Sequence, residues 1–143
     1  MISTNNLEKA RQMLKKEKYP KIVQAQDDKF NRKILEYGNF DILLSPEQGN
    51  RKNKIRQTDS GLNHVLTKIA AKNDIAIGIN LEEIKRLGKK EKAERLAKIK
   101  QNIIICRKAK TKLAIFSATK QESINLLQSL GASTQQAKET ILF

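Results

Sequence analysis

The stretch Ile75-Ala76-Ile77-Gly78-Ile79-Asn80 is the clearest strand signal in this chain of 143 residues. It is a short apolar run, partly β-branched, which is typical of a buried strand. Asn80 closes the run, and asparagine is a favoured N-cap residue because its side chain can accept a backbone hydrogen bond. We therefore expect a buried strand over 75–79 that leads directly into a short helix over 81–87.

Apolar runs and helical periodicity alternate along the rest of the chain. Three further strands are predicted at 22–23, 40–44 and 113–116. Apolar residues at a period of 3.6 predict helices over 7–18, 28–37, 59–72, 89–109, 121–130 and 133–140. In the longest of these helices, the residues expected to face the core are Ala93, Leu96, Ile99, Ile103 and Cys106.

This alternation of strands and helices implies a parallel sheet with crossover helices. A closed (β/α) barrel needs eight strands, twice the number expected here. We therefore predict one α/β domain over residues 1–143, built as a partial or miniature (β/α) barrel or as a small open sheet. An open parallel sheet leaves unpaired strand edges, which a partner can cover.

Positive charge dominates the composition. The chain has 29 Lys and Arg against 15 Asp and Glu, a net charge of +14 and a pI of about 10.0. Residues 51–56 carry four basic residues and no acid, residues 85–112 carry twelve basic and two acidic residues, and the remainder is neutral. Such segments bind polyanions, with an affinity that falls steeply with salt because phosphate contacts release counterions. The alternative is a solvated face that only keeps the chain soluble.

Several classes of protein do not fit the sequence. The single cysteine, Cys106, excludes an intrachain disulfide and any site with several cysteine ligands, and its place on an apolar helix face indicates a core residue. The N-terminal residues lack the apolar region of a secretory signal. No run approaches the ~20 apolar residues of a membrane span. We therefore expect a cytoplasmic protein that does not act at a membrane.

Catalytic chemistry finds little support in the residues. His64 is the only histidine, which is too few for the multi-histidine metal centres of hydrolases. Asp41, Asp59 and Asp74 leave a carboxylate-only Mg²⁺ site open in principle, although Asp59 and Asp74 also suit helix caps or turns. We expect no catalytic residue and no metal ligand in this chain.

Residues 41–80 resemble a known family. Asp41-Ile-Leu-Leu-Ser-Pro46, Asp59-Ser-Gly-Leu-Asn-His64 and the strand 75–80 follow the order seen in ribonuclease P protein component 3, the archaeal counterpart of the 30-kDa subunit of eukaryotic ribonuclease P. Arg107-Lys108 and Leu127-Gln-Ser-Leu-Gly131 continue the resemblance, which covers roughly residues 20–143. Family members begin with further strands before the position of 22–23, so relative to the family we expect a chain shortened at its N-terminus.

The resemblance implies a fold and a role. The family's fold is akin to the TIM and PHP-like barrels of metal-dependent phosphoesterases, but the protein is not the catalyst. Ribonuclease P is an endoribonuclease that removes the 5′ leader of precursor tRNA, and its RNA holds the Mg²⁺ ions and hydrolyses the phosphodiester. The resemblance therefore implies a subunit that binds no cofactor itself. Its implied partners are ribonuclease P RNA, precursor tRNA indirectly, protein component 2 and the other protein subunits.

The candidate RNA-binding residues are polar or basic. Neither basic segment contains an aromatic residue, so we expect contacts mainly to phosphate and sugar. The candidates are Arg51, Lys52, Lys54, Arg56, Asn63, His64, Lys68, Arg86, Lys89, Lys90, Lys92, Arg95, Lys98, Arg107 and Lys108. Two other functions stay open: a generic basic ribonucleoprotein module and, with less support, a small metal-dependent phosphoesterase.

Overall fold

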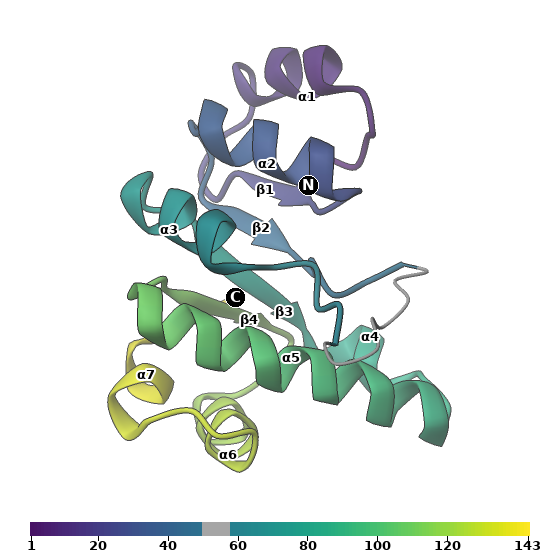
Figure 1. Ribbon diagram of the computed structural model, residues 1–143, viewed down its shortest axis with the longest axis vertical. Helices are drawn as coiled ribbons and strands as arrows, with labels where there is room; N and C mark the ends of the chain where they lie inside the picture. Colours follow the sequence, from purple (N-terminus) through teal and green to yellow (C-terminus); the bar gives the residue numbers. More distant parts are fainter. Residues whose placement is uncertain (50–57) are drawn as a thin grey trace.

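The computed structural model describes residues 1–49 and 58–143 and contains one parallel β-sheet (Figure 1). The strands are β1 (Ile22–Gln24), β2 (Ile42–Leu44), β3 (Ala76–Asn80), β4 (Leu113–Phe116) and β5 (Ile141–Leu142). They lie in the order β1-β2-β3-β4-β5, each parallel to the next. The order never reverses, as it does in doubly wound sheets, and is that of a (β/α) barrel segment. The predicted parallel sheet with crossover helices is confirmed.

Seven helices occur in the described residues: α1 (Leu7–Leu14), α2 (Asp28–Tyr37), α3 (His64–Lys72), α4 (Leu81–Lys85), α5 (Lys89–Ala109), α6 (Lys120–Ser129) and α7 (Thr134–Glu139). Most follow a residue whose side chain accepts a backbone N–H of the first turn, such as Asp27 before α2 and, as predicted, Asn80 before α4. Gly88, before α5, offers no side-chain cap. The long helix predicted over 89–109 is present with those bounds.

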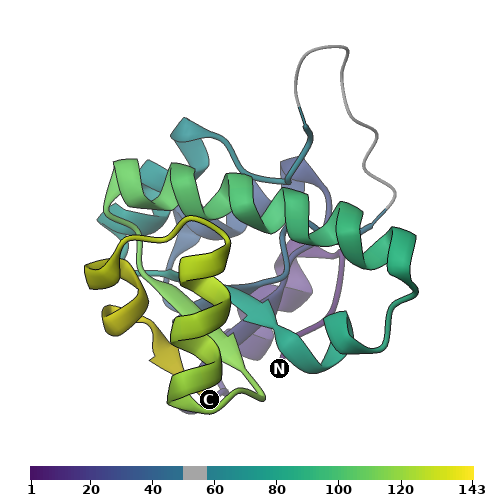
Figure 2. The same cartoon turned by 90° about the horizontal axis from the view of Figure 1, so that it is seen from below.

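The core lies between one face of the sheet and the helices. Alternate strand residues, among them Leu43, Ile77 and Ile115, pack in one cluster with apolar residues of α2, α3 and α5. Figure 2 shows α5 across one side of the molecule and both chain ends on the other. The helices therefore cover one face of the sheet, the arrangement of a barrel wall.

The opposite face of the sheet carries a smaller apolar cluster. Ile42, Ala76 and Ala114 are buried there, with Phe116 packed against them. The Phe116 ring stacks on that of Phe143 with centroids 5.2 Å apart, and the Tyr19 ring lies 6.5 Å from Phe143. Tyr19 precedes β1 and Phe143 follows β5, so residues that flank the first and last strands of the sheet lie close together.

Several element boundaries correct the sequence predictions. The third helix begins at His64 rather than at Asp59 or Ser60, because Asp59 accepts the N–H of Gly61 in a turn and Asn63 caps the helix. The first helix ends at Leu14, four residues early. A fifth strand, Ile141–Leu142, follows α7, where no element was expected. Ala93 is exposed instead of facing the core.

We expect Gly78→Ala to lower the free energy of unfolding by about 1–3 kcal/mol. A Cβ at Gly78 would lie 2.8 Å from Cγ2 of Ile42, a methyl group branched from its own Cβ and unable to swing away, and 3.0 Å from Cδ1 of Leu44. Urea denaturation followed by circular dichroism measures this change. The control is Gly88→Ser, where nothing lies within 4 Å and serine can cap α5, so stability should hold or rise slightly.

Candidate RNA-binding surface

The first cluster of basic residues surrounds the start of α5. Lys89, Lys90 and Lys92 lie in its first turns, and Lys85 and Arg86 precede them at the end of α4. Cations at a helix N-terminus oppose the helix dipole, and Gly88 provides no side-chain acceptor to offset this. Helix stability therefore does not explain this concentration of charge. We name residues 85–92 the α5 start cluster.

A second basic cluster lies at the other end of the same helix. Arg107 and Lys108 occupy the last turn of α5, and Lys110 and Lys112 follow in the connection to β4. We name these four residues the α5 end cluster. A helix of 21 residues is ~30 Å long, so the two clusters are separated by that distance. Lys98 and Lys100 lie on the helix between the two clusters, so the predicted basic segment over 85–112 follows the length of α5 with most of its charge at the two ends.

Helix α3 adds the remaining polar candidates near the α5 end cluster. The hydroxyl of Thr111 donates to the carbonyl of Thr67, which ties the middle of α3 to the connection that follows α5. Asn63 uses its side-chain oxygen to cap α3, so its main role here is structural. His64 and Lys68 are exposed on this helix and one turn apart. Their positions suit contact with a phosphate backbone.

Arg95 does not fit its prediction as an RNA contact. Its side chain is only 10% exposed, and its Nε and Nη1 groups donate to Oε1 of Glu47 (3.2 Å) and Oε1 of Glu83 (3.0 Å). A buried guanidinium paired with two carboxylates is not available to a phosphate. Arg95 also faces the interior where the sequence periodicity placed Ala93. Its pairing with Glu47 and Glu83 is the physical reason why Ala93 is exposed.

A chain of hydrogen bonds extends from this ion cluster across the carboxyl ends of the strands. Gln48 donates to the same Glu83 oxygen (2.6 Å) and accepts from Gln24 of β1 (2.8 Å). Burial raises the pKa of the Glu47 carboxyl, although the positive charge of Arg95 acts in the opposite direction. These contacts join β1, the segment after β2, α4 and α5, and so fix the start of α5.

The other candidates lie at the surface. Arg86 pairs with Glu82 on α4, Arg107 donates to the carbonyl of Gly131 (3.0 Å), and Lys98 is half-buried. Lys108 is exposed on the last turn of α5. Four further candidates fall outside the described residues: Arg51, Lys52, Lys54 and Arg56.

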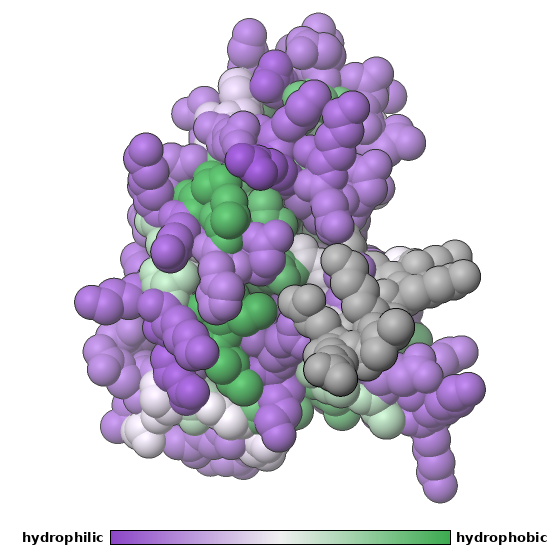
Figure 3. All heavy atoms as spheres, viewed as in Figure 1, coloured by the Kyte–Doolittle hydropathy of each residue, from purple (hydrophilic) through white to green (hydrophobic). Residues whose placement is uncertain are grey.

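Figure 3 shows hydrophilic side chains over most of the helix-covered face, with an apolar area over α3, where Val65 is 49% exposed.

Sequence reasoning missed two groups of residues that shape this surface. Glu47 and Glu83 hold Arg95, yet an acid in a loop and an acid in a short helix carry no signal of burial. Lys110 and Lys112 were counted in the basic segment but not singled out. The sequence did carry a signal for them, because the helical period of α5 ends just before Lys110. Both lysines therefore lie in the connection after the helix.

Other kinds of site were sought in residues 1–49 and 58–143. That part of the chain has no group of three or more His, Cys, Asp or Glu side chains placed to hold a metal ion. It also has no helix with the length and apolar character needed to span a bilayer. Cys106 is buried, which raises the pKa of its thiol to about 12, so the thiolate needed of a nucleophile does not form at neutral pH.

Comparisons with known proteins support the family resemblance. No family model matches the chain. Ribonuclease P protein component 3 of Methanococcus vannielii is 32% identical over 95 residues, 66% of this chain and 38% of that protein. The same component of Methanosarcina acetivorans is 30% identical over 128 residues, 84% of this chain and 50% of that protein. This chain is related to ribonuclease P protein component 3. It spans half or less of the length of these component 3 relatives.

A solved structure supports the fold. A chain in the cryo-EM structure of archaeal ribonuclease P with mature tRNA superimposes with a TM-score of 0.79 at 23% identity. The superposition covers 96% of this chain and 61% of that chain. The five-stranded sheet and its helices are therefore a fold also found in that larger chain, as the resemblance to component 3 implies.

Removing Arg95 should destabilise the protein strongly. We expect Arg95→Ala to lower the free energy of unfolding by about 3–5 kcal/mol, because it leaves the Glu47 carboxylate buried without a counter-ion. Arg86→Ala, which breaks the exposed pair with Glu82, should cost at most about 1 kcal/mol. Urea denaturation at pH 7 compares the two. Equal losses would mean that the buried cluster adds nothing beyond a surface ion pair.

The Glu47 carboxyl should also change how the free energy of unfolding depends on pH. Its raised pKa means that the folded state binds a proton more readily than the unfolded state, whose value is near 4.5. Wild-type stability relative to Glu47→Gln should therefore fall as pH rises above 4.5, by up to about 1.4 kcal/mol per pH unit. Urea denaturation between pH 4 and 8 measures it, with the exposed-site variant Glu82→Gln as control. A difference that is flat or rises with pH would contradict the assignment.

Proposed function

We propose that this chain is a protein subunit of ribonuclease P that binds and stabilises the catalytic RNA for removal of the 5′ leader from precursor tRNA. The observation that carries the proposal is the sequence similarity to component 3 of several archaea over as much as 84% of the chain. The net charge of +14 supports it independently, because it suits an RNA partner.

The two clusters on α5 supply the mechanism. A folded RNA brings phosphates of different segments close together, and their mutual repulsion opposes compaction. The α5 start cluster and the α5 end cluster lie ~30 Å apart on one rigid helix and therefore neutralise phosphates on two segments at once. The ion cluster around Arg95 holds the helix in place, so the spacing between the two charged ends is fixed before the RNA binds.

The chemistry in this proposal belongs to the RNA. Ribonuclease P RNA holds the Mg²⁺ ions and hydrolyses the phosphodiester, while the protein lowers the Mg²⁺ concentration that the RNA needs to fold. The chain is then part of an endoribonuclease holoenzyme without being its catalyst, and it meets precursor tRNA only indirectly. Its protein partner is component 2, with which members of this family pair, and the complex works in the cytoplasm.

Charge removal at the α5 start cluster tests the proposal. We expect the triple variant Lys89→Gln, Lys90→Gln, Lys92→Gln to weaken binding to ribonuclease P RNA and to reduce the slope of log affinity against log salt by about 2–3. The reconstituted holoenzyme should need more Mg²⁺ for the same rate of leader cleavage. Filter binding over a salt series and a Mg²⁺ titration of cleavage measure the two effects.

A matched triple variant controls for net charge. Lys9, Lys15 and Lys33 are exposed and lie away from α5, so their change to Gln removes the same charge from another surface. That variant should bind ribonuclease P RNA nearly as well as wild type. Equal loss in both triples would show that only total charge matters. Equal affinity of wild type for ribonuclease P RNA and for ribosomal RNA fragments of the same size would favour a generic RNA-binding module instead.

A further inference from the structure

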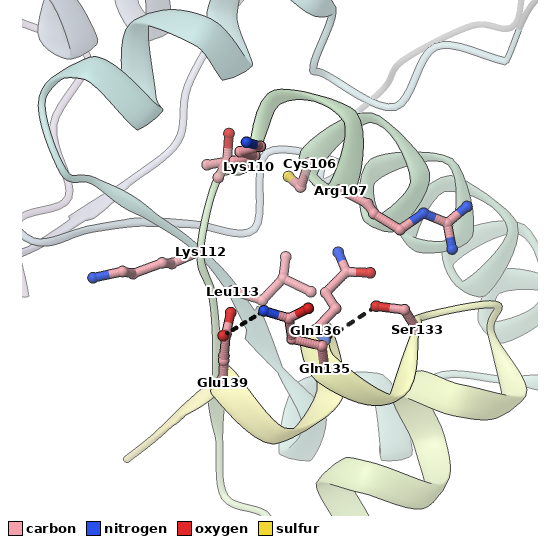
Figure 4. A pocket seen from close by; sticks show the side chains of 10 residues that line it. Cys106, Arg107, Lys110, Lys112, Leu113, Ser133, Gln135, Gln136 and Glu139 are labelled. Carbon is pink, nitrogen blue, oxygen red and sulfur yellow. Dashed lines mark hydrogen bonds between the residues drawn. The ribbon is translucent and has the colours of Figure 1, made fainter.

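A pocket lies beside the α5 end cluster, on the far side of the molecule from the α5 start cluster. It has a volume of about 460 Å³ and opens between the C-terminal end of α5, the start of β4 and α7 (Figure 4). Leu113 and Cys106, both buried, form an apolar wall, and the side chains of Gln135 and Gln136 reach in from α7. Its size and mixed lining are those of a small-molecule site.

Gln136 gives the pocket an unused acceptor. Its Nε2 donates to the carbonyl of Ile103 (2.9 Å). A carbonyl can only accept, so this bond fixes which end of the amide is nitrogen and which is oxygen. The Oε1 atom is buried and has no hydrogen-bond partner among the described residues. Buried acceptors are seldom left without a donor, so this oxygen calls for one from a molecule in the pocket.

Cations surround the opening of the pocket. Arg107, Lys110 and Lys112 belong to its lining, and Figure 4 shows the side chains of Arg107 and Lys112 extending to opposite sides. The only carboxylate in the lining, Glu139, already accepts a hydrogen bond from Gln135 (3.0 Å), and Lys112 pairs with the exposed Asp74 (3.4 Å). A ligand with negative charge on two sides and hydrogen-bond donors in the middle matches this distribution.

We propose that the pocket holds one unstacked nucleotide of the bound RNA. The base lies against Leu113 and donates from an amino or imino N–H to Gln136 Oε1, while the phosphates on its two sides contact Arg107 and the two lysines. This deepens the proposed function and rests on it for the identity of the RNA. It also adds base contact to an interface for which the sequence suggested contacts mainly to phosphate and sugar, because unstacked bases are what proteins read in RNA.

Mononucleotides test the pocket without the whole RNA. The wild-type protein labelled with ¹⁵N is titrated with AMP, CMP, GMP and UMP, and separately with inorganic phosphate and ribose 5-phosphate. We expect nucleotides to shift the amide signals of residues 106–113 and 133–139, and the two base-free probes to shift them several-fold less at equal concentration. Equal shifts from phosphate alone would reduce the pocket to an anion site and overturn base insertion. So would the absence of shifts at these residues.

A matched pair of charge variants carries the test to the RNA. Lys110 lines the pocket, whereas Lys100 is exposed on the same helix, does not line the pocket and lies in neither basic cluster. Lys110→Gln should weaken binding to ribonuclease P RNA by about 10-fold or more, the range of a lost charged hydrogen bond, and Lys100→Gln by about 2-fold or less. Equal effects of the two variants would overturn the proposal.

Failure of the pocket and failure of the proposed function give different results. One result is that the protein prefers ribonuclease P RNA over other structured RNAs, while nucleotides shift no amide signals and the two lysine variants bind RNA equally well. That result would overturn the pocket proposal and leave the proposed function standing. The other result is that the protein shows no preference for ribonuclease P RNA, while nucleotides shift the amide signals of residues 106–113 and 133–139. That result would overturn the proposed function and leave a nucleotide-binding site. Gln135→Trp, which fills the opening from an exposed position, should abolish those shifts while circular dichroism stays as in wild type.

Discussion

The pairing of Arg95 with Glu47 and Glu83 is the constraint on which the charged surface depends. A guanidinium removed from water needs its counter-ions, so α5 can lie on the sheet in only one rotational setting once Arg95 points inward. Ile99, Ile103 and Cys106 then face the core on the same side of the helix, at the spacing that a helix requires. Lys89 and Lys90 at the start of the helix and Lys108 at its end are left exposed to solvent.

Most of the fold could be predicted from the sequence, because its signals are local. Four of the five strands, the parallel arrangement and the cap at Asn80 follow from short apolar runs and a residue that suits a helix start. The fifth strand could not be predicted, since Ile141-Leu142 is too short to show a period and exists only because β4 offers a free edge. The start of α3 was predicted too early, because Asp59, Ser60 and Asn63 can each act as a helix cap and only Asn63 does so.

The candidate surface was predictable in its charge but not in its geometry. Composition identifies the basic segment, but only the folded chain separates it into two clusters and removes Arg95 from the surface. The burial of Glu47 depends on Arg95, which lies 48 residues away in sequence. A local sequence pattern cannot predict a contact over that separation. The pocket beside the α5 end cluster likewise combines α5, β4 and α7, whose relation is fixed by strand order rather than by residue spacing.

The lysines at the uncapped start of α5 link the stability of the protein to its ligand. In the free protein, like charges crowd the positive end of a helix dipole, and this self-repulsion lowers the free energy of unfolding. A polyanion that binds only the folded form removes the repulsion and adds its own binding free energy by mass action. Under the proposed function that polyanion is RNA, so chains in excess of RNA open more often than bound chains and are more exposed to proteases.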